Sequence, residues 1–182
     1  ARHFGLDEID ELVDMAAQKN AAGHNVYLSA ALRIETCARN CRAKKSDVHS
    51  AHCLWGDFDG EGDLATAIDI LEARRLTASF VTITGRHPHE RGQVWFFLED
   101  PTVDLETVEA INKALRDLTH GDKVQNRDRL MRLPGSLAWP TKQGRRLEPT
   151  FKHPHPTRAA PYTLEELHLK LGCNDEREGN QQ

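Results

Sequence analysis

The sequence predicts an α+β fold with a mixed, largely antiparallel sheet flanked by helices. Segments with helical spacing of apolar residues and segments rich in β-branched or aromatic residues occur without a regular strand-helix alternation. Two apolar strand segments, 79–84 and 93–98, are separated only by the turn GRHPHERG, which is typical of an antiparallel hairpin. The 182 residues contain no internal repeat and suffice for one domain with one hydrophobic core.

The first half of the chain contains, in order, a helix, two strands and a second helix. The first helix is indicated by apolar residues at helical spacing beside many carboxylates, namely Leu6, Ile9, Leu12, Val13 and Ala16. The predicted ranges are 7–20 for this helix, 25–32 and 52–59 for the strands, and 64–76 for the second helix. A polar, basic loop, CRAKKSD, separates the two strands.

The second half continues with the hairpin, a third helix, a run of short strands and a last helix. The third helix is predicted over 104–118, with Gly121 as a stop. Proline and glycine break the stretch MRLPGSLAWPTKQGRRLEPTFK into short strands. Thr163 and Glu166 have the spacing of a capping box that begins a helix ending at Leu171. We therefore expect one domain over 1–171 and a polar tail or linker over 172–182.

Composition excludes several classes of protein. The chain lacks an apolar run of about 18 residues and a secretory signal pattern, so we expect a cytoplasmic protein without membrane contact. The net charge of −4 argues against a uniformly basic nucleic-acid binder. Residues 121–160, however, contain nine Lys or Arg and three acids, a net charge of +6. This segregation favours a local phosphate site.

The cysteines leave two interpretations open. Four of them, Cys37, Cys41, Cys53 and Cys173, are too few for a disulfide scaffold in a chain of this length, so reduced thiols are expected. A zinc site is the alternative, with ligands from Cys37, Cys41, His49, His52 and Cys53, although their spacing matches no standard zinc knuckle.

The stretch LWGDFDGEGD at 54–63 is dense in carboxylates. A calcium loop beginning at Asp57 fits until its twelfth position, where Ile68 replaces the required bidentate Glu. In a strand, however, residues i and i+2 point to the same face, so Asp57 and Asp59 would share one space. Magnesium or manganese would relieve the repulsion between them, and the alternative is an acidic strand end with a glycine turn.

Two later segments supply cations and a third acid. The loop TGRHPHERGQVW contains Arg86, His87, His89 and Arg91 between two strands. The segment GDKVQNRDRLMRLPGS adds Asp122 among several arginines. Carboxylates that hold metal ions and cations that hold phosphates are the two halves of a nucleotidyl-transfer site.

In combination, these motifs resemble the archaeo-eukaryotic primase (AEP) superfamily, in particular the RepB-like primase and primase-polymerase domains of phages and plasmids. The motifs that carry the resemblance are, in order, Asp57-x-Asp59, Thr84-Gly-Arg-His-Pro-His89 before an apolar strand, Gly121-Asp122, Arg132-Leu-Pro-Gly-Ser136 and Trp139-Pro-x-Lys142. The resemblance covers roughly 26–152, and the combined order is far more specific than any single motif. The sequence departs from the pattern at Gly56, which precedes the first motif, and in the segment CARNCRAKK.

The resemblance implies a modified RRM-like core that adds nucleotides to DNA with two magnesium or manganese ions. Asp57, Asp59 and a third acid, Asp122 in preference to Asp128, would be metal ligands and catalytic, and His89 in preference to His87 would contact the nucleotide phosphates. The nucleotide-binding residues implied in this way are Arg86, His89, Arg91, Gln93, Arg132, Ser136 and Lys142.

The implied partners are nucleoside triphosphates and a single-stranded DNA template. The template would cross residues 121–160, where Trp139 offers a ring for base stacking. The resemblance further implies a helicase module in a longer replication protein of a phage or plasmid.

Two other functions remain open. His87-Pro-His89 is similar to the paired histidines of rolling-circle nicking endonucleases, which need a nucleophilic tyrosine, and only Tyr27 and Tyr162 are present. A non-catalytic module that binds an origin or single-stranded DNA would use the arginines for phosphates and need no metal ion.

Overall fold

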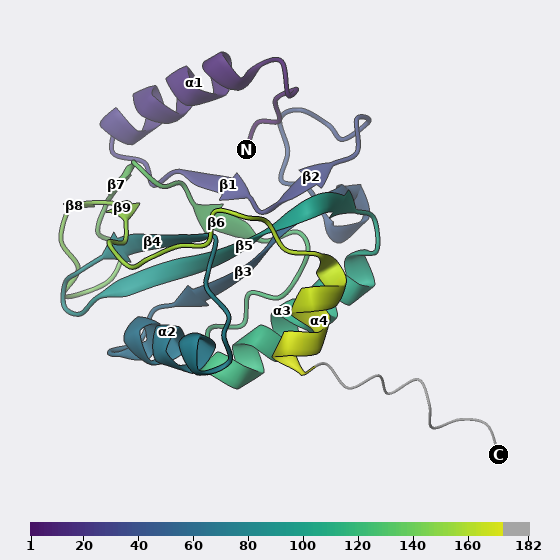
Figure 1. Cartoon of the computed structure of the whole chain (residues 1–182). Helices are drawn as coiled ribbons and strands as arrows, with labels where there is room; N and C mark the ends of the chain where they lie inside the picture. Colours follow the sequence, from purple (N-terminus) through teal and green to yellow (C-terminus); the bar gives the residue numbers. More distant parts are fainter. Residues whose placement is uncertain (173–182) are drawn as a thin grey trace.

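The computed structural model describes residues 1–172, and Cys173 with the rest of the predicted tail lies outside the described residues. A twisted five-stranded sheet forms the centre of the molecule (Figure 1), with strand order β2-β3-β5-β4-β9. The strands are β2 (Ala31–Arg33), β3 (Val48–Phe58), β4 (Phe80–Gly85), β5 (Arg91–Thr102) and β9 (Phe151–Lys152). Each pairing in this sheet is antiparallel. The predicted hairpin is the β4–β5 pair.

Three helices cover one side of this sheet, and the first helix lies on the other side (Figure 1). The three helices on one side are α2 (Asp63–Ala73), α3 (Leu105–Thr119) and α4 (Leu164–Leu171). The helix on the other side is α1 (Ile9–Ala21). The core combines apolar residues of the strands and of these three helices, including Leu54, Phe96, Leu71, Ile111 and Leu167. The α+β prediction with a largely antiparallel, helix-flanked sheet is confirmed. Within residues 1–172, no helix is long and apolar enough to cross a membrane.

The single strand predicted over 25–32 is wrong, because the chain changes sheets at Ala30. The first part, β1 (Tyr27–Ser29), pairs with β6 (Leu130–Arg132), whereas the next residues enter β2 and pair with β3. At the junction, the backbone N–H of Ala30 donates to the carbonyl oxygen of Arg129. The second two-stranded sheet, β7 (Leu137–Ala138) with β8 (Glu148–Pro149), fits the predicted run of short strands.

Side chains cap the starts of two helices, Asp104 that of α3 and Thr163, as predicted, that of α4. The side chain of Asp104 accepts a hydrogen bond from the backbone N–H of Thr107, and Thr163 accepts one from that of Glu166. The second half of the capping box is absent, because the Glu166 carboxylate pairs with Arg158 and Lys170 instead. Helix α3 ends at His120, whose left-handed backbone stops the helix one residue before Gly121.

Helix α1 forms where the sequence predicts it, but much of its apolar side is exposed. Ile9 and Val13 on the helix are each 56% exposed, and Leu6, which precedes the helix, is 73% exposed. Buried Asn20 attaches the end of the helix to β7, because its side chain donates to the carbonyl oxygen of Leu137 (2.8 Å) and accepts from the N–H of the same residue (2.7 Å). The helix is thus held by polar contacts rather than by burial in the main core.

Glu109 on α3 connects two loops. Its carboxylate accepts hydrogen bonds from the backbone N–H and guanidinium of Arg127 and lies 2.9 Å from the Lys45 ammonium. Burial alone would raise the pKa of Glu109, but hydrogen bonds from Arg127 and Lys45 outweigh burial and lower the pKa to about 2. The carboxylate therefore stabilises the fold above its unfolded-state pKa of 4.5, and this stabilisation is lost as the pH falls toward 2.

We expect Glu109→Gln to lower the free energy of unfolding at pH 7 by about 1–2 kcal/mol, because the charged partners lose their anion. The difference from the wild type should shrink when urea unfolding is repeated at pH 3.5. Glu106→Gln, at an exposed position on the same helix, is the matched control and should change stability little at either pH. An equal loss for both variants would contradict the ion-pair interpretation.

Candidate active site

Asp57 and Asp59 line one cleft at the end of β3. Asp57 is the penultimate residue of the strand, and Asp59 follows its last residue. The cleft has a volume of about 220 Å³ and contains both carboxylates in its wall. The two side chains share this space because residues two apart on extended backbone point to the same side.

A row of polar residues crosses three adjacent strands beneath the cleft. Asp57 on β3 is the register partner of Gln93 on β5, which is the register partner of Thr82 on β4. The Gln93 side chain favours the charged form of the Asp57 carboxylate and so acts to lower its pKa, against the larger effect of burial. The buried Oε1 of Gln93 and Oγ1 of Thr82 have no hydrogen-bond partner among the described residues. An unpartnered buried oxygen beside a carboxylate is a place where a bound ion or its water would find a further contact.

Asp122 reaches the same end of β3 from the loop after α3. Its backbone N–H donates to the carbonyl oxygen of Asp57 at 2.8 Å. Gly121 permits this approach, because a Cβ atom there would lie 2.9 Å from the Phe58 ring and 3.2 Å from the Asp57 carbonyl oxygen. The loop is anchored by the buried indole of Trp55, which donates to the carbonyl oxygen of Val124 at 2.7 Å.

The three carboxylates act on one another electrostatically. Burial, followed by the charges of Asp59 and Asp122, raises the pKa of Asp57 to about 6. Burial and the charges of Asp59 and Asp63 also raise the pKa of Asp122. For Asp59, burial would raise the pKa, but Arg145 at 2.6 Å and Lys142 at 3.2 Å outweigh it and lower the pKa.

Oxygen donors and unrelieved negative charge fit magnesium or manganese, which prefer carboxylate ligands. In the described structure, the Asp59 carboxylate is paired with Arg145 and Lys142 instead. Within residues 1–172, the carboxylate oxygens of Asp57, Asp59 and Asp122 do not form a group whose members all lie within 4.8 Å of one another. A divalent ion would therefore have to compete with the two cations for Asp59.

Most of the predicted nucleotide-binding residues lie in the cleft. Arg91, Gln93, Arg132 and Lys142 all line it. Arg91 is buried with its guanidinium 3.7 Å from the Glu148 carboxylate. The cleft also contains three cationic side chains of the basic segment 121–160 that the sequence motifs did not single out, Arg129, Arg145 and Arg146. The positive charge of this segment predicts a phosphate site, but it does not indicate which of its lysines and arginines face the phosphate.

His89 lies beside the acids without lining the cleft. Its Nε2 atom is hydrogen-bonded to the backbone oxygen of Asp59 at 2.8 Å. His87, its alternative, pairs with Glu148 through Nδ1. The two histidines therefore have different partners, and within residues 1–172 they belong to no compact group of metal ligands.

The structure does not bring Arg86 and Ser136 into the cleft. The Arg86 guanidinium stacks over the Phe151 ring at 4.6 Å and pairs with Glu90 at 3.4 Å. Ser136 is buried, and its hydroxyl donates to the carbonyl oxygen of Leu133 at 2.7 Å. These contacts give both side chains structural partners in place of the predicted nucleotide.

Two other predicted positions can be located. Asp128 accepts a hydrogen bond from Asn126, and neither Asp128 nor Asp122 is among the residues that line the cleft; of the two, Asp122 has the backbone contact with Asp57. Trp139 lines the cleft, half-buried, with its indole N–H donating to Asn20.

The residues of the alternative zinc site, Cys37, Cys41, His49, His52 and Cys53, do not form one compact group within residues 1–172. Cys53 is buried, its thiol donates to the carbonyl oxygen of Ala30, and in residues 1–172 the compact ligand group that includes Cys37 and Cys41 is completed by His3.

Two solved structures are similar to this chain. The AEP domain of the primase-polymerase (PrimPol) of cyanophage S-2L is 21% identical over 87% of this chain and 76% of that chain, with a TM-score of 0.62. Primase RepB' is 18% identical over 94% of this chain, with a TM-score of 0.59, and the chain spans about half of its length (51%). The protein therefore has a primase-polymerase fold of the AEP type, as the sequence motifs predicted. No protein-family model and no curated protein sequence matches the chain.

Proposed function

We propose that this chain is the catalytic domain of a DNA primase-polymerase, which adds nucleotides from nucleoside triphosphates to a growing strand on single-stranded DNA. The observation that carries the proposal is the meeting of Asp57, Asp59 and Asp122 at one strand end beside a cleft lined by arginines. The AEP-type fold of the two similar structures supports the same function. Phage or plasmid replication is the proposed setting, and a helicase module in a longer protein stays a prediction from the sequence.

The proposed roles follow from the contacts. Asp57, Asp59 and Asp122 would hold two magnesium or manganese ions, which when bound supply charge stabilisation for phosphoryl transfer. Arg91, Arg132, Arg145 and Lys142 would neutralise the triphosphate, which guanidinium groups bind through paired hydrogen bonds. His89 would position the Asp59 backbone in addition to approaching a phosphate.

The template would enter along the basic residues that line the cleft outside the acids. Arg129 and Arg146 provide phosphate contacts there, and the half-buried ring of Trp139 offers one exposed side for stacking. Tyr27 adds a second aromatic ring to the cleft wall, held by the Arg132 guanidinium 3.1 Å from its hydroxyl.

A template-dependent extension assay tests the proposal. The chain is incubated with single-stranded DNA and labelled ribo- or deoxyribonucleoside triphosphates, with magnesium or manganese, and with or without a primer. Products longer than the primer that require both template and metal ion support the proposal. Absence of incorporation under all combinations, with DNA binding intact, would contradict it.

A second candidate is a DNA-binding module without catalysis. It is favoured by the pairing of Asp59 with Arg145 and Lys142, which neutralises the acid without a metal ion. This module would bind single-stranded DNA with strong salt dependence and show no manganese-dependent nucleotide binding in calorimetry.

The nicking endonuclease is a third candidate because Tyr27 lines the cleft. Tyr162 cannot be its nucleophile in this structure, because its side chain is 1% exposed and its hydroxyl donates to Thr77. A covalent 5′-phosphotyrosyl product that disappears in Tyr27→Phe would favour this function over synthesis.

A further inference from the structure

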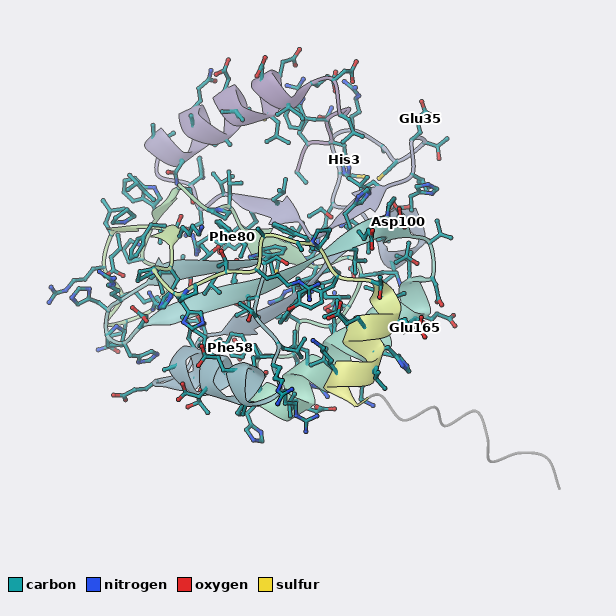
Figure 2. All side chains as sticks on the ribbon, in the orientation of Figure 1. His3, Glu35, Phe58, Phe80, Asp100 and Glu165 are labelled. Atoms are coloured by element: carbon teal, nitrogen blue, oxygen red, sulfur yellow. The ribbon has the colours of Figure 1, made fainter. Side chains whose placement is uncertain are left out.

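A second cluster of ligating side chains lies at the opposite end of β3 from the acids. One nitrogen of His3 and the sulfur atoms of Cys37 and Cys41 all lie within 4.8 Å of one another. Among residues 1–172, no other group of three or more His, Cys, Asp or Glu side chains has its ligand atoms this close together. It adjoins the edge where β2 pairs with the start of β3, so roughly 30 Å of strand separates it from Asp57. Figure 2 shows His3 well away from Phe58, the residue next to Asp57.

Backbone contacts hold the two segments of this cluster together. The N–H of His3 donates to the carbonyl oxygen of Arg39, midway between the cysteines, at 2.8 Å. The His3 Nε2 atom lies 2.8 Å from the Cys41 carbonyl oxygen and 3.9 Å from the Cys37 sulfur. The Arg39 guanidinium pairs with Glu8 at 2.7 Å, which fixes the start of α1 to the same loop. The side chains are therefore brought together by the fold and not by chance proximity of two free loops.

The donor set differs in kind from that of the cleft. Two sulfur atoms and an imidazole are the ligands that zinc takes in proteins, and a Cys-x3-Cys spacing is within the range of zinc sites. Asp47 is a nearby carboxylate, and its charge, second to burial, raises the pKa of the Cys37 thiol. Asp47 is not included among the ligands because it already accepts a hydrogen bond from the Lys44 backbone N–H at 2.6 Å.

We propose that His3, Cys37 and Cys41 bind one zinc ion, with solvent at the fourth position, and that this ion fastens the N-terminal segment to the 34–47 loop. The site is separate from the proposed nucleotidyl-transfer centre and does not depend on that function. Magnesium and manganese would occupy the oxygen ligands of the cleft, and zinc the sulfur ligands, because hard and soft cations prefer different donors.

A structural ion would reinforce the few polar contacts that hold this region. Between β2 and β3 the described backbone contains one short 3-10 helix, η1 (Lys45–Asp47). In the adjoining α1, Ile9 and Val13 are exposed rather than packed in the core, and so is Leu6 just before the helix. A metal ion bound only in the folded chain, by residues 34 or more positions apart, stabilises the fold by an amount that grows with the logarithm of the ratio of free zinc to its dissociation constant.

The test uses the whole chain, purified under reducing conditions, loaded with zinc and dialysed. Metal analysis should give one zinc per chain, and cobalt substitution should give the sulfur-to-cobalt charge-transfer absorption of a thiolate site. Cys37→Ser and Cys41→Ser should each abolish stoichiometric zinc, and His3→Ala should weaken zinc affinity roughly tenfold or more. Chelation of the wild type should lower Tm by on the order of 5 °C.

Two exposed histidines provide matched controls. His49→Ala and His52→Ala lie outside the proposed ligand set and should retain one zinc and the cobalt spectrum of the wild type. Loss of zinc in these variants but not in His3→Ala would overturn the proposed ligands. A wild-type chain that takes up no zinc while reduced, or that forms a Cys37–Cys41 disulfide with no change of Tm on chelation, would overturn the site itself.

Discussion

Replacement of Asp57 and Asp59 by alanine, singly or together, is expected to reduce nucleotide incorporation by a factor on the order of 10³ or more. The physical reason is that both carboxylates line the cleft and supply the oxygen donors for divalent ions that would stabilise the transferred phosphate. Single-turnover extension at saturating manganese measures this loss. Residual activity near the wild-type level would contradict the proposed metal site.

The fold should survive these substitutions. Burial and the neighbouring acids raise the pKa of Asp57 to about 6, so its charge is unfavourable in the folded protein without a cation. Removing the carboxylate relieves this repulsion, and Asp57→Asn should keep or raise Tm while activity is lost, as is common for residues retained for function. Glu61→Ala, an exposed acid in the same stretch, is the matched control and should retain both activity and Tm.

The sequence was sufficient to predict that Asp57 and Asp59 lie together, because their placement depends on local strand geometry. Asp57 and Asp59 share a face through strand periodicity alone, and the hairpin across from them follows from two short apolar segments. Asp122 needed the resemblance to the AEP superfamily, since a glycine and an aspartate after a helix have no distinctive pattern. Its contact with the Asp57 carbonyl oxygen depends on Gly121 packing against Phe58, which is a tertiary feature.

The remaining differences come from contacts between distant segments. Arg129 and Arg145 face the cleft because of the paths taken by the connections around β6 and β8, and the sequence predicts only that their region is basic. His3 joins the cysteines because its backbone pairs with Arg39, whereas the sequence suggested the nearer His49 and His52. Ser136 has the polar side chain of a ligand-binding residue, but the loop buries it against Leu133.

Arg145→Ala is expected to weaken nucleotide binding and strengthen metal binding. The guanidinium lies in the cleft, where it would bind the triphosphate, so KM for the nucleotide should rise roughly tenfold to a hundredfold. The same group lies 2.6 Å from the Asp59 carboxylate and competes with any divalent ion for it. Without Arg145, manganese titrated in the absence of nucleotide and followed by electron paramagnetic resonance should bind more tightly.

Weaker nucleotide binding together with stronger metal binding would distinguish a role of Arg145 in the site from a role in the fold. If Arg145 served only to hold Asp59 in place, its removal would weaken both metal and nucleotide binding, and Arg145→Lys would restore both together. If it acts as a phosphate ligand that also occupies Asp59 in the empty site, lysine would restore part of the nucleotide affinity and again oppose the metal ion. Lys113→Ala, which removes an exposed cation from α3, controls for net charge and should change neither affinity. The cations that pair with Asp59 would then neutralise this half-buried acid until metal and nucleotide arrive together. The incoming triphosphate would draw Arg145 and Lys142 away from the Asp59 carboxylate.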